Sequence, residues 1–208
     1  MARMQLWVVV HLNGHEGLGA VGVCPWGRIR PMASDIDAPE GGMASGGVIR
    51  VGTWNMSHWA LHKLDIIQRE LGVDLLALQE THLALDHLRL AHAATRRVGW
   101  RLYHGRDVPV AAGGWGRSCG VGFLAAPGVA IQPALPVGAA WRRLHAICRL
   151  HAVRLAPRPG LPAGMLLLSV YAPVQGHAAQ LERAQFNAAF MELVHGLDMQ
   201  TPTILLGD

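Results

Sequence analysis

Three short apolar runs, each ending at a polar residue, constrain the fold of this chain more than any other feature. The run Leu-Leu-Ala-Leu-Gln ends at the carboxylate of Glu80. Residues 48–54 end in the same way before Asn55, and residues 203–207 end before Asp208. Such runs predict buried strands. We therefore expect an amide and two carboxylates at strand ends, and oxygen ligands of this kind suit a hard divalent cation such as Mg²⁺.

The segments between these strands predict helices. Residues 57–71 place apolar side chains at helical spacing, with Ser57 as a suitable N-cap. Residues 83–97 and 178–197 repeat the helical spacing. A strand, a helix and a strand within about thirty residues are typical of an α/β beginning.

Two further apolar segments predict an antiparallel hairpin. Residues 144–155 alternate in the manner of a strand, a turn rich in proline and glycine follows, and residues 165–170 complete the pair. Adjacent antiparallel strands exclude a purely parallel, doubly wound sheet. The sequence therefore predicts an α+β domain over residues 48–208.

Residues 1–47 differ from the rest of the chain. They show no sustained hydrophobic period and carry scattered glycine and proline, which predicts a flexible leader. No apolar run approaches the ~20 residues of a membrane span, and the run at 6–12 is interrupted too early for a secretory signal. The three cysteines show no close-paired spacing. We therefore expect an intracellular protein, nuclear or cytoplasmic.

The positive charge is concentrated in one segment. Residues 96–158 contain ten arginines and a single acidic residue, Asp107. Contacts to phosphate dominate the affinity of proteins for nucleic acids, so this segment predicts binding to DNA, with RNA as a second candidate. The alternative is compositional. Because Lys63 is the only lysine, the chain uses arginine wherever it needs a cation.

Four short motifs at these strand ends resemble those of the endonuclease/exonuclease/phosphatase superfamily, in the same order. They are Trp54-Asn55, Gln79-Glu80-Thr81, Tyr171-Ala172-Pro173 and Gly207-Asp208. Each motif alone is a weak signal, but four in order at strand ends are a strong one. The resemblance covers residues 48–208 and implies a four-layer α/β/β/α sandwich of two mixed sheets with outer helices.

The resemblance also implies a function and assigns roles. It implies a metal-dependent phosphodiesterase, an endonuclease-like domain that hydrolyses phosphodiester bonds in DNA with Mg²⁺ or Mn²⁺. By this resemblance Glu80 holds the metal, and Asn55 helps to position the metal and the phosphate. Tyr171 reaches the scissile phosphate through its hydroxyl, and Asp208 orients the attacking water or stabilises the transition state.

Each role has a simpler alternative. Glu80 could be a solvated strand end, and Asn55 could form an Asx turn as the chain leaves its strand. Tyr171 could be an aromatic side chain packed at a sheet edge. The sequence alone leaves these alternatives open.

The chain departs from the family pattern on its C-terminal side. The asparagine that follows the family's aspartate has no counterpart after Asp208, and neither has the Ser-Asp-His motif that carries the catalytic histidine. None of the twelve histidines is placed like that residue, and we interpret them as surface or core residues. We therefore expect an incomplete sandwich, truncated at its C-terminal side, with negligible nuclease activity.

The substrate class is less constrained than the chemistry. The spacing from residues 79–83 to residues 120–124, with arginines following, looks most like the endonuclease domains of non-LTR retrotransposons. DNA-repair endonucleases that act at abasic sites are the next most similar. Two alternatives stay open: a phosphatase of the same superfamily acting on a lipid or inositol phosphate, and a non-catalytic remnant that binds polyanions.

Overall fold

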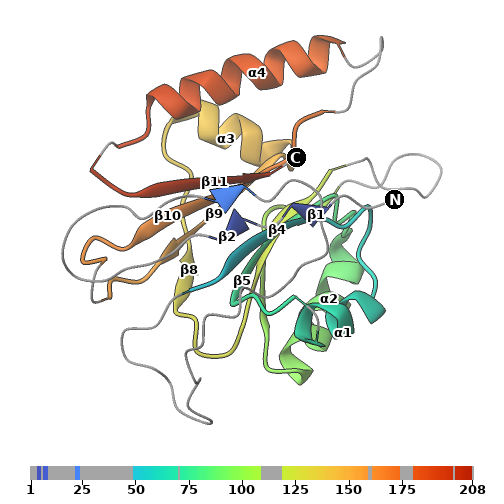
Figure 1. Cartoon of the computed structure of the whole chain (residues 1–208). Helices are drawn as coiled ribbons and strands as arrows, with labels where there is room; N and C mark the ends of the chain where they lie inside the picture. Colours follow the sequence, from blue (N-terminus) through green and yellow to red (C-terminus); the bar gives the residue numbers. More distant parts are fainter. Residues whose placement is uncertain are drawn as a thin grey trace.

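Two mixed β-sheets lie face to face, with helices on their outer sides (Figure 1). A separate, two-stranded antiparallel sheet joins β2 (Trp7–Val8) and β3 (Gly22–Val23). The computed structural model of the chain describes residues 4–5, 7–8, 22–23, 49–69, 71–108, 119–158, 161–173, 180–198 and 200–207.

The first sheet has the strand order β1-β4-β5-β7-β6. Strands β4 and β5 run parallel, and the other neighbouring pairs run antiparallel. The strands are β1 (Met4–Gln5), β4 (Val51–Asn55), β5 (Leu75–Gln79), β6 (Arg101–His104) and β7 (Val121–Ala125).

The second sheet has the strand order β11-β10-β9-β8. Strands β10 and β11 run parallel, and the other pairs run antiparallel. The strands are β8 (Ile131–Pro133), β9 (Leu150–Leu155), β10 (Met165–Val170) and β11 (Thr203–Gly207).

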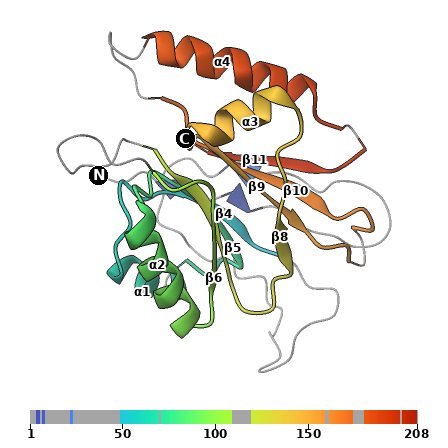
Figure 2. The same cartoon turned by 180° about the vertical axis from the view of Figure 1, so that it is seen from behind.

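Two helices cover the outer face of each sheet, as both views show (Figure 2). Helices α1 (His62–Arg69) and α2 (Leu85–Arg97) pack on the first sheet. Helices α3 (Gly138–Ala146) and α4 (Gln180–His195) pack on the second. A third apolar cluster fills the space between the sheets.

Strand β5 shows why the sequence folds into these layers. Its side chains alternate between the two faces of the sheet, as in any strand. Leu75 and Ala77 face the second sheet, whereas Leu76 and Leu78 face the helices. Because both faces are covered, every residue of the strand is buried. The predicted α+β class and the α/β/β/α sandwich of two mixed sheets are confirmed.

The local predictions succeed in part. The hairpin that joins β9 to β10 is antiparallel, as expected. A single strand over 144–155 was wrong, because residues up to 146 belong to α3, where Trp141 and Leu144 face the second sheet at a helical spacing of three. Ser57 is not the N-cap of α1, which begins at His62. None of the helices in the described residues is long and apolar enough to cross a membrane.

The predicted leader over residues 1–47 stays a prediction. Within that range the structure describes only the six residues of β1, β2 and β3. Strand β1 pairs with β4, with Met4 opposite Trp54.

Candidate active site at the ends of the two sheets

Two of the predicted site residues leave the first sheet at the same edge. Asn55 is the last residue of β4, and Glu80 directly follows β5. These strands run parallel, and Asn55 is paired with Gln79 in the register. Asn55 and Glu80 therefore lie at the ends of two neighbouring strands, at the same end of the sheet.

Tyr171 joins this edge from the second sheet. It directly follows β10, and its side chain is 3% exposed. Its hydroxyl donates a hydrogen bond to the carboxylate of Glu80, a residue 91 positions earlier in the chain. Two of the residues named by the sequence motifs are thus in direct contact.

The other two predicted residues have different outcomes. The side-chain oxygen of Asn55 accepts a hydrogen bond from the backbone N–H of Ser57 at 3.0 Å, so Asn55 forms the Asx turn that was its simpler interpretation. This turn holds the side chain in place at the end of β4. Asp208 lies outside the described residues, and its role stays a prediction.

The backbone around Glu80 adopts an unusual conformation. Glu80 has a φ of 51° and His82 a φ of 52°, in a region that non-glycine residues rarely occupy. Backbone bonds hold this segment, from Thr81 N to Gly120 O and from His82 N to Cys119 O, both at 3.2 Å. Conformations of this kind persist where the surroundings enforce them, and they cluster at functional sites.

A buried polar chain links the two sheets directly below this edge. The hydroxyl of Thr53 donates to Oε1 of Gln79 at 2.9 Å, and Nε2 of Gln79 donates to the hydroxyl of Ser169 at 3.0 Å. Ser169 in turn donates to the carbonyl of Leu78 at 3.0 Å. Sequence reasoning missed these residues as a group. The available signal was a polar residue inside otherwise apolar strands.

Arg149 supports Tyr171 and was also missed. Its side chain is buried, and its guanidinium carbon lies 4.9 Å from the centroid of the Tyr171 ring, a cation–π contact. Its Nη2 donates to the carboxylate of Glu182 on α4 at 2.9 Å. Its carbonyl accepts from the backbone N–H of Tyr171 at 3.0 Å. This arginine of the basic segment is therefore a packed residue of the site.

Other arginines of the 96–158 segment lie far from Glu80. Arg154 is paired with Leu166 near the start of β10, whereas Tyr171 follows the end of that strand. Arg101 is paired with Ala125, which is paired in turn with Leu75 at the start of β5. The segment thus contributes to both ends of the sheets. Binding of nucleic acid through the segment as a whole stays a prediction.

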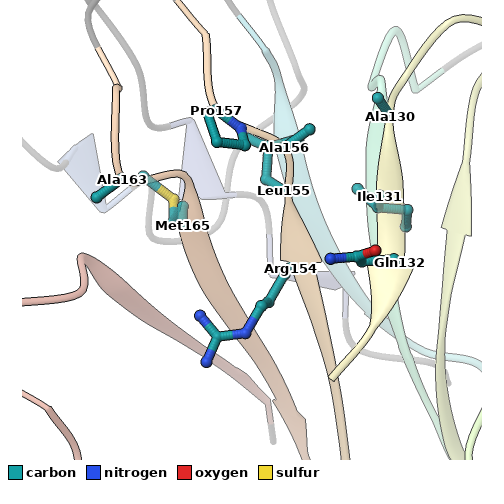
Figure 3. Close-up of a pocket in the computed structure, with 9 residues that line it drawn as sticks. All are labelled: Ala130, Ile131, Gln132, Arg154, Leu155, Ala156, Pro157, Ala163 and Met165. Carbon is teal, nitrogen blue, oxygen red and sulfur yellow. The ribbon is translucent and has the colours of Figure 1, made fainter. Parts of the chain in front are cut away.

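The hollow drawn in Figure 3 lies at the end of the second sheet that is opposite to Tyr171. It has a volume of about 380 Å³ and is lined by residues from the start of β8, the end of β9 and the start of β10. Arg154 and Gln132 are neighbours in register at its wall. It therefore does not contain the residues that the sequence motifs single out.

Buried histidines surround the site but do not bear charge. Nε2 of His104 lies 2.6 Å from the hydroxyl of Thr81, and burial lowers the pKa of His104 to about 4. Burial, together with the nearby His104 and His145, lowers the pKa of His151 to about 3. Both residues are neutral at pH 7, which agrees with their interpretation as core histidines.

The buried His151 predicts a loss of stability in acid. In the unfolded chain this histidine takes up a proton near pH 6.5, but in the folded protein it does so only near pH 3. The unfolded state therefore binds more protons in that window, and stability falls as the pH falls from 6.5 towards 3. Between pH 7 and pH 5 we expect His151 to account for about 2 kcal/mol of lost unfolding free energy.

Urea titrations at the two pH values measure this loss. His151→Leu is the matched variant, because neither ring nitrogen has a hydrogen-bond partner within the residues that the structure describes. The wild-type protein should lose more stability than the variant over this interval. Equal losses in the two proteins would contradict the assignment of His151 as a neutral buried group.

Several solved structures share this fold. An AP endonuclease from Archaeoglobus fulgidus matches with a TM-score of 0.57 and 17% identity, over 77% of this chain and 57% of that one. The 3'-5' exonuclease NExo from Neisseria meningitidis matches with a TM-score of 0.53 and 22% identity, over 76% and 56%. The catalytic domain of human Nocturnin, with bound sulfate, gives 0.51 and 14%, over 77% and 63%. No protein-family model and no curated protein matches the sequence.

These similarities concern the fold. The chain spans a little over half the length of the first two structures, and the identities are low. This chain has both mixed sheets with their outer helices, the arrangement that the resemblance of its motifs implied. The resemblance is therefore confirmed at the level of architecture: this chain has the fold of the endonuclease/exonuclease/phosphatase superfamily.

Proposed function

We propose that this chain is a divalent-metal-dependent phosphodiesterase domain that acts on DNA. The observation that carries the proposal is the hydrogen bond from Tyr171 to Glu80, made across the two sheets beside Asn55. The fold adds support, because two similar structures are described as an AP endonuclease and a 3'-5' exonuclease. A phenol, a carboxylate and an amide at one edge are suited to a metal-assisted reaction at phosphorus.

The donor set fits a hard cation. Mg²⁺ and Mn²⁺ favour oxygen ligands, and Mg²⁺ sites keep several waters beside one or two carboxylates. Within the described parts of the chain, no three side chains of His, Cys, Asp or Glu are grouped to hold a metal. Glu80, helped by the amide oxygen of Asn55, would hold the ion. When bound, such an ion supplies Lewis-acid polarisation of a phosphoryl oxygen.

Tyr171 is the residue placed to bind the phosphate itself. A phenol has one proton to donate, and here the carboxylate of Glu80 accepts it. If that carboxylate were occupied in holding a cation, the hydroxyl would be able to donate to a phosphate oxygen instead. Arg149 keeps the ring in place during this exchange. Asp208 is proposed to orient the attacking water or to stabilise the transition state, as the motif implies.

Removal of the Tyr171 hydroxyl tests this role. Tyr171→Phe keeps the ring that stacks on Arg149 but removes the donor. We expect the cleavage rate with Mg²⁺ to fall by about 10²-fold, in the range found when a transition-state donor is deleted. Affinity for Mn²⁺ should be retained, because Glu80 is unchanged. The rate is measured under single-turnover conditions with excess enzyme, so that product release does not limit it.

The second tyrosine supplies a matched control. The hydroxyl of Tyr103 donates to the carbonyl of Ile131 at 3.2 Å, so Tyr103→Phe also removes one phenolic hydrogen bond. This variant should cleave at the wild-type rate. If both variants cleave equally well, Tyr171 has no part in the reaction.

The substrate class is tested with three DNAs in the same assay. Supercoiled plasmid reports nicking of intact DNA, a duplex with one abasic site reports repair-type incision, and a duplex with a 3'-phosphate reports phosphatase activity. The phosphatase arm is included because a similar structure is described as a 3' phosphatase bound to a product DNA hairpin. Salt-dependent DNA binding with no Mg²⁺-dependent cleavage of any of the three would instead indicate a non-catalytic remnant.

A further inference from the structure

Two buried cysteines meet beside the candidate active site. Cys119 lies two residues before the start of β7, and Cys148 lies between α3 and β9. They are 4% and 2% exposed and pack together with Val108. Their side chains are hydrogen-bonded to each other, and neither is part of a disulfide. This pair was not evident from the sequence, because the two residues are 29 positions apart.

The backbones of the two cysteines hold the residues of the site. The carbonyl of Cys119 accepts from the N–H of His82 at 3.2 Å, within the strained segment that follows Glu80. Cys148 directly precedes Arg149, whose carbonyl accepts from the N–H of Tyr171. A further bond, from Gly120 N to Cys148 O at 3.1 Å, ties the two segments together. The thiol pair thus lies between the chain segment of Glu80 and that of Tyr171.

We propose that Cys119 and Cys148 are an oxidation site, at which a peroxide joins them in an intrachain disulfide that disturbs the neighbouring active site. The formation of the bond follows from the contact between the thiols. Its effect on catalysis rests on the proposed function.

One hydrogen peroxide molecule is enough to oxidise the two thiols to a disulfide. One sulfur attacks the peroxide, the O–O bond breaks, and a sulfenic acid and one water form. The second sulfur attacks the sulfenic sulfur, the S–S bond forms, and the S–O bond breaks with release of a second water. Two thiols and one hydrogen peroxide give one disulfide and two waters. A thiol reductant reverses the bond by thiol–disulfide exchange.

The surroundings of the pair make this reaction slow. The hydrogen bond with Cys119, together with burial, raises the pKa of the Cys148 thiol above its ordinary value. Because the thiolate is the attacking species, a thiol held neutral reacts slowly. The pair should therefore remain reduced during brief exposure and respond only to sustained oxidant.

The disulfide would alter the geometry of the site. An S–S bond is about 2.05 Å long, which is shorter than any contact between unbonded sulfurs. We expect its formation to shift the Cys119 and Cys148 backbones, whose neighbouring carbonyls bond the N–H groups of His82 and Tyr171. A misplacement on the order of 1 Å lowers enzymatic rates by about 10²-fold.

The test uses the full chain carrying Cys24→Ser, so that no third thiol competes. The protein is incubated with hydrogen peroxide for increasing times, and half of each sample is then treated with dithiothreitol. We expect the mass to fall by two hydrogens, and non-reducing proteolysis to yield a peptide that joins Cys119 to Cys148. Mg²⁺-dependent cleavage should fall by at least ten-fold and return after reduction.

Two variants keep the test decisive. With Cys24→Ser as background, Cys148→Ala or Cys119→Ala removes one partner, and neither protein should form the bridge or lose activity reversibly. Bridges between chains, oxidation to sulfinic acid, or two intact thiols after prolonged exposure would overturn the proposal. A bridged peptide from a protein whose reduced form shows no cleavage would uphold the oxidation site while refuting the proposed function.

Discussion

Glu80→Gln is expected to abolish divalent-cation binding at the candidate active site and to lower Mg²⁺-dependent cleavage of DNA by at least about 10³-fold. Glutamine has the size of glutamate, and its carbonyl oxygen can still accept the hydrogen bond from Tyr171. The substitution therefore changes charge far more than shape. Hard cations depend on carboxylate charge, which this substitution removes from the proposed ligand.

Calorimetric titration with Mn²⁺ measures the binding, and single-turnover cleavage measures the reaction. Asp74→Asn is the matched control, because Asp74 directly precedes β5 and Glu80 directly follows it. Asp74 accepts a hydrogen bond from the backbone N–H of Arg50 at 2.7 Å, so its loss perturbs the fold locally. Cation binding should survive in this control. If Glu80→Gln retains its affinity for Mn²⁺, Glu80 is not a ligand of the metal.

The strands that form the site were predictable, because strands buried on both faces appear in the sequence as continuous apolar runs. Strand β5 is covered on both faces, which requires an unbroken apolar run and makes the polar residue at its end conspicuous. Glu80 was recognised in this way, whereas Tyr171, at the end of the equally buried β10, was singled out by the motif that it begins. The order of the motifs then predicted the sandwich without any knowledge of its contacts.

The contacts between the sheets could not be predicted, because they join residues far apart in sequence. Gln79 and Ser169 are 90 positions apart, and nothing in their local patterns pairs them. Arg149 looked like one cation among ten, since burial against Tyr171 depends on the packing of α4 and the second sheet. Helix α3 was missed because its short apolar spacing also suits the start of a strand.

Gln79→Leu is expected to cost about 2–4 kcal/mol of unfolding free energy, although leucine suits a buried strand. The hydroxyl of Thr53 would lose its acceptor, and the hydroxyl of Ser169 would lose its donor, both in the space between the sheets. A buried polar group left unsatisfied costs about 1–3 kcal/mol, which outweighs the gain from the larger apolar side chain. Urea unfolding at 25 °C measures the loss.

Two further variants distinguish the loss of the buried hydrogen bonds of Gln79 from the mere replacement of a glutamine by leucine. Gln68→Leu removes an exposed glutamine that bonds the carbonyl of Val98 at 3.4 Å, and it should cost less than about 0.5 kcal/mol. Adding Thr53→Val to Gln79→Leu removes the Thr53 hydroxyl that has lost its acceptor, while the shape of the side chain is kept. This double variant should recover about 1 kcal/mol, because replacing both partners by apolar groups avoids the desolvation penalty. A double variant less stable than Gln79→Leu alone would show that the Thr53 hydroxyl does not depend on Gln79 for its hydrogen bond.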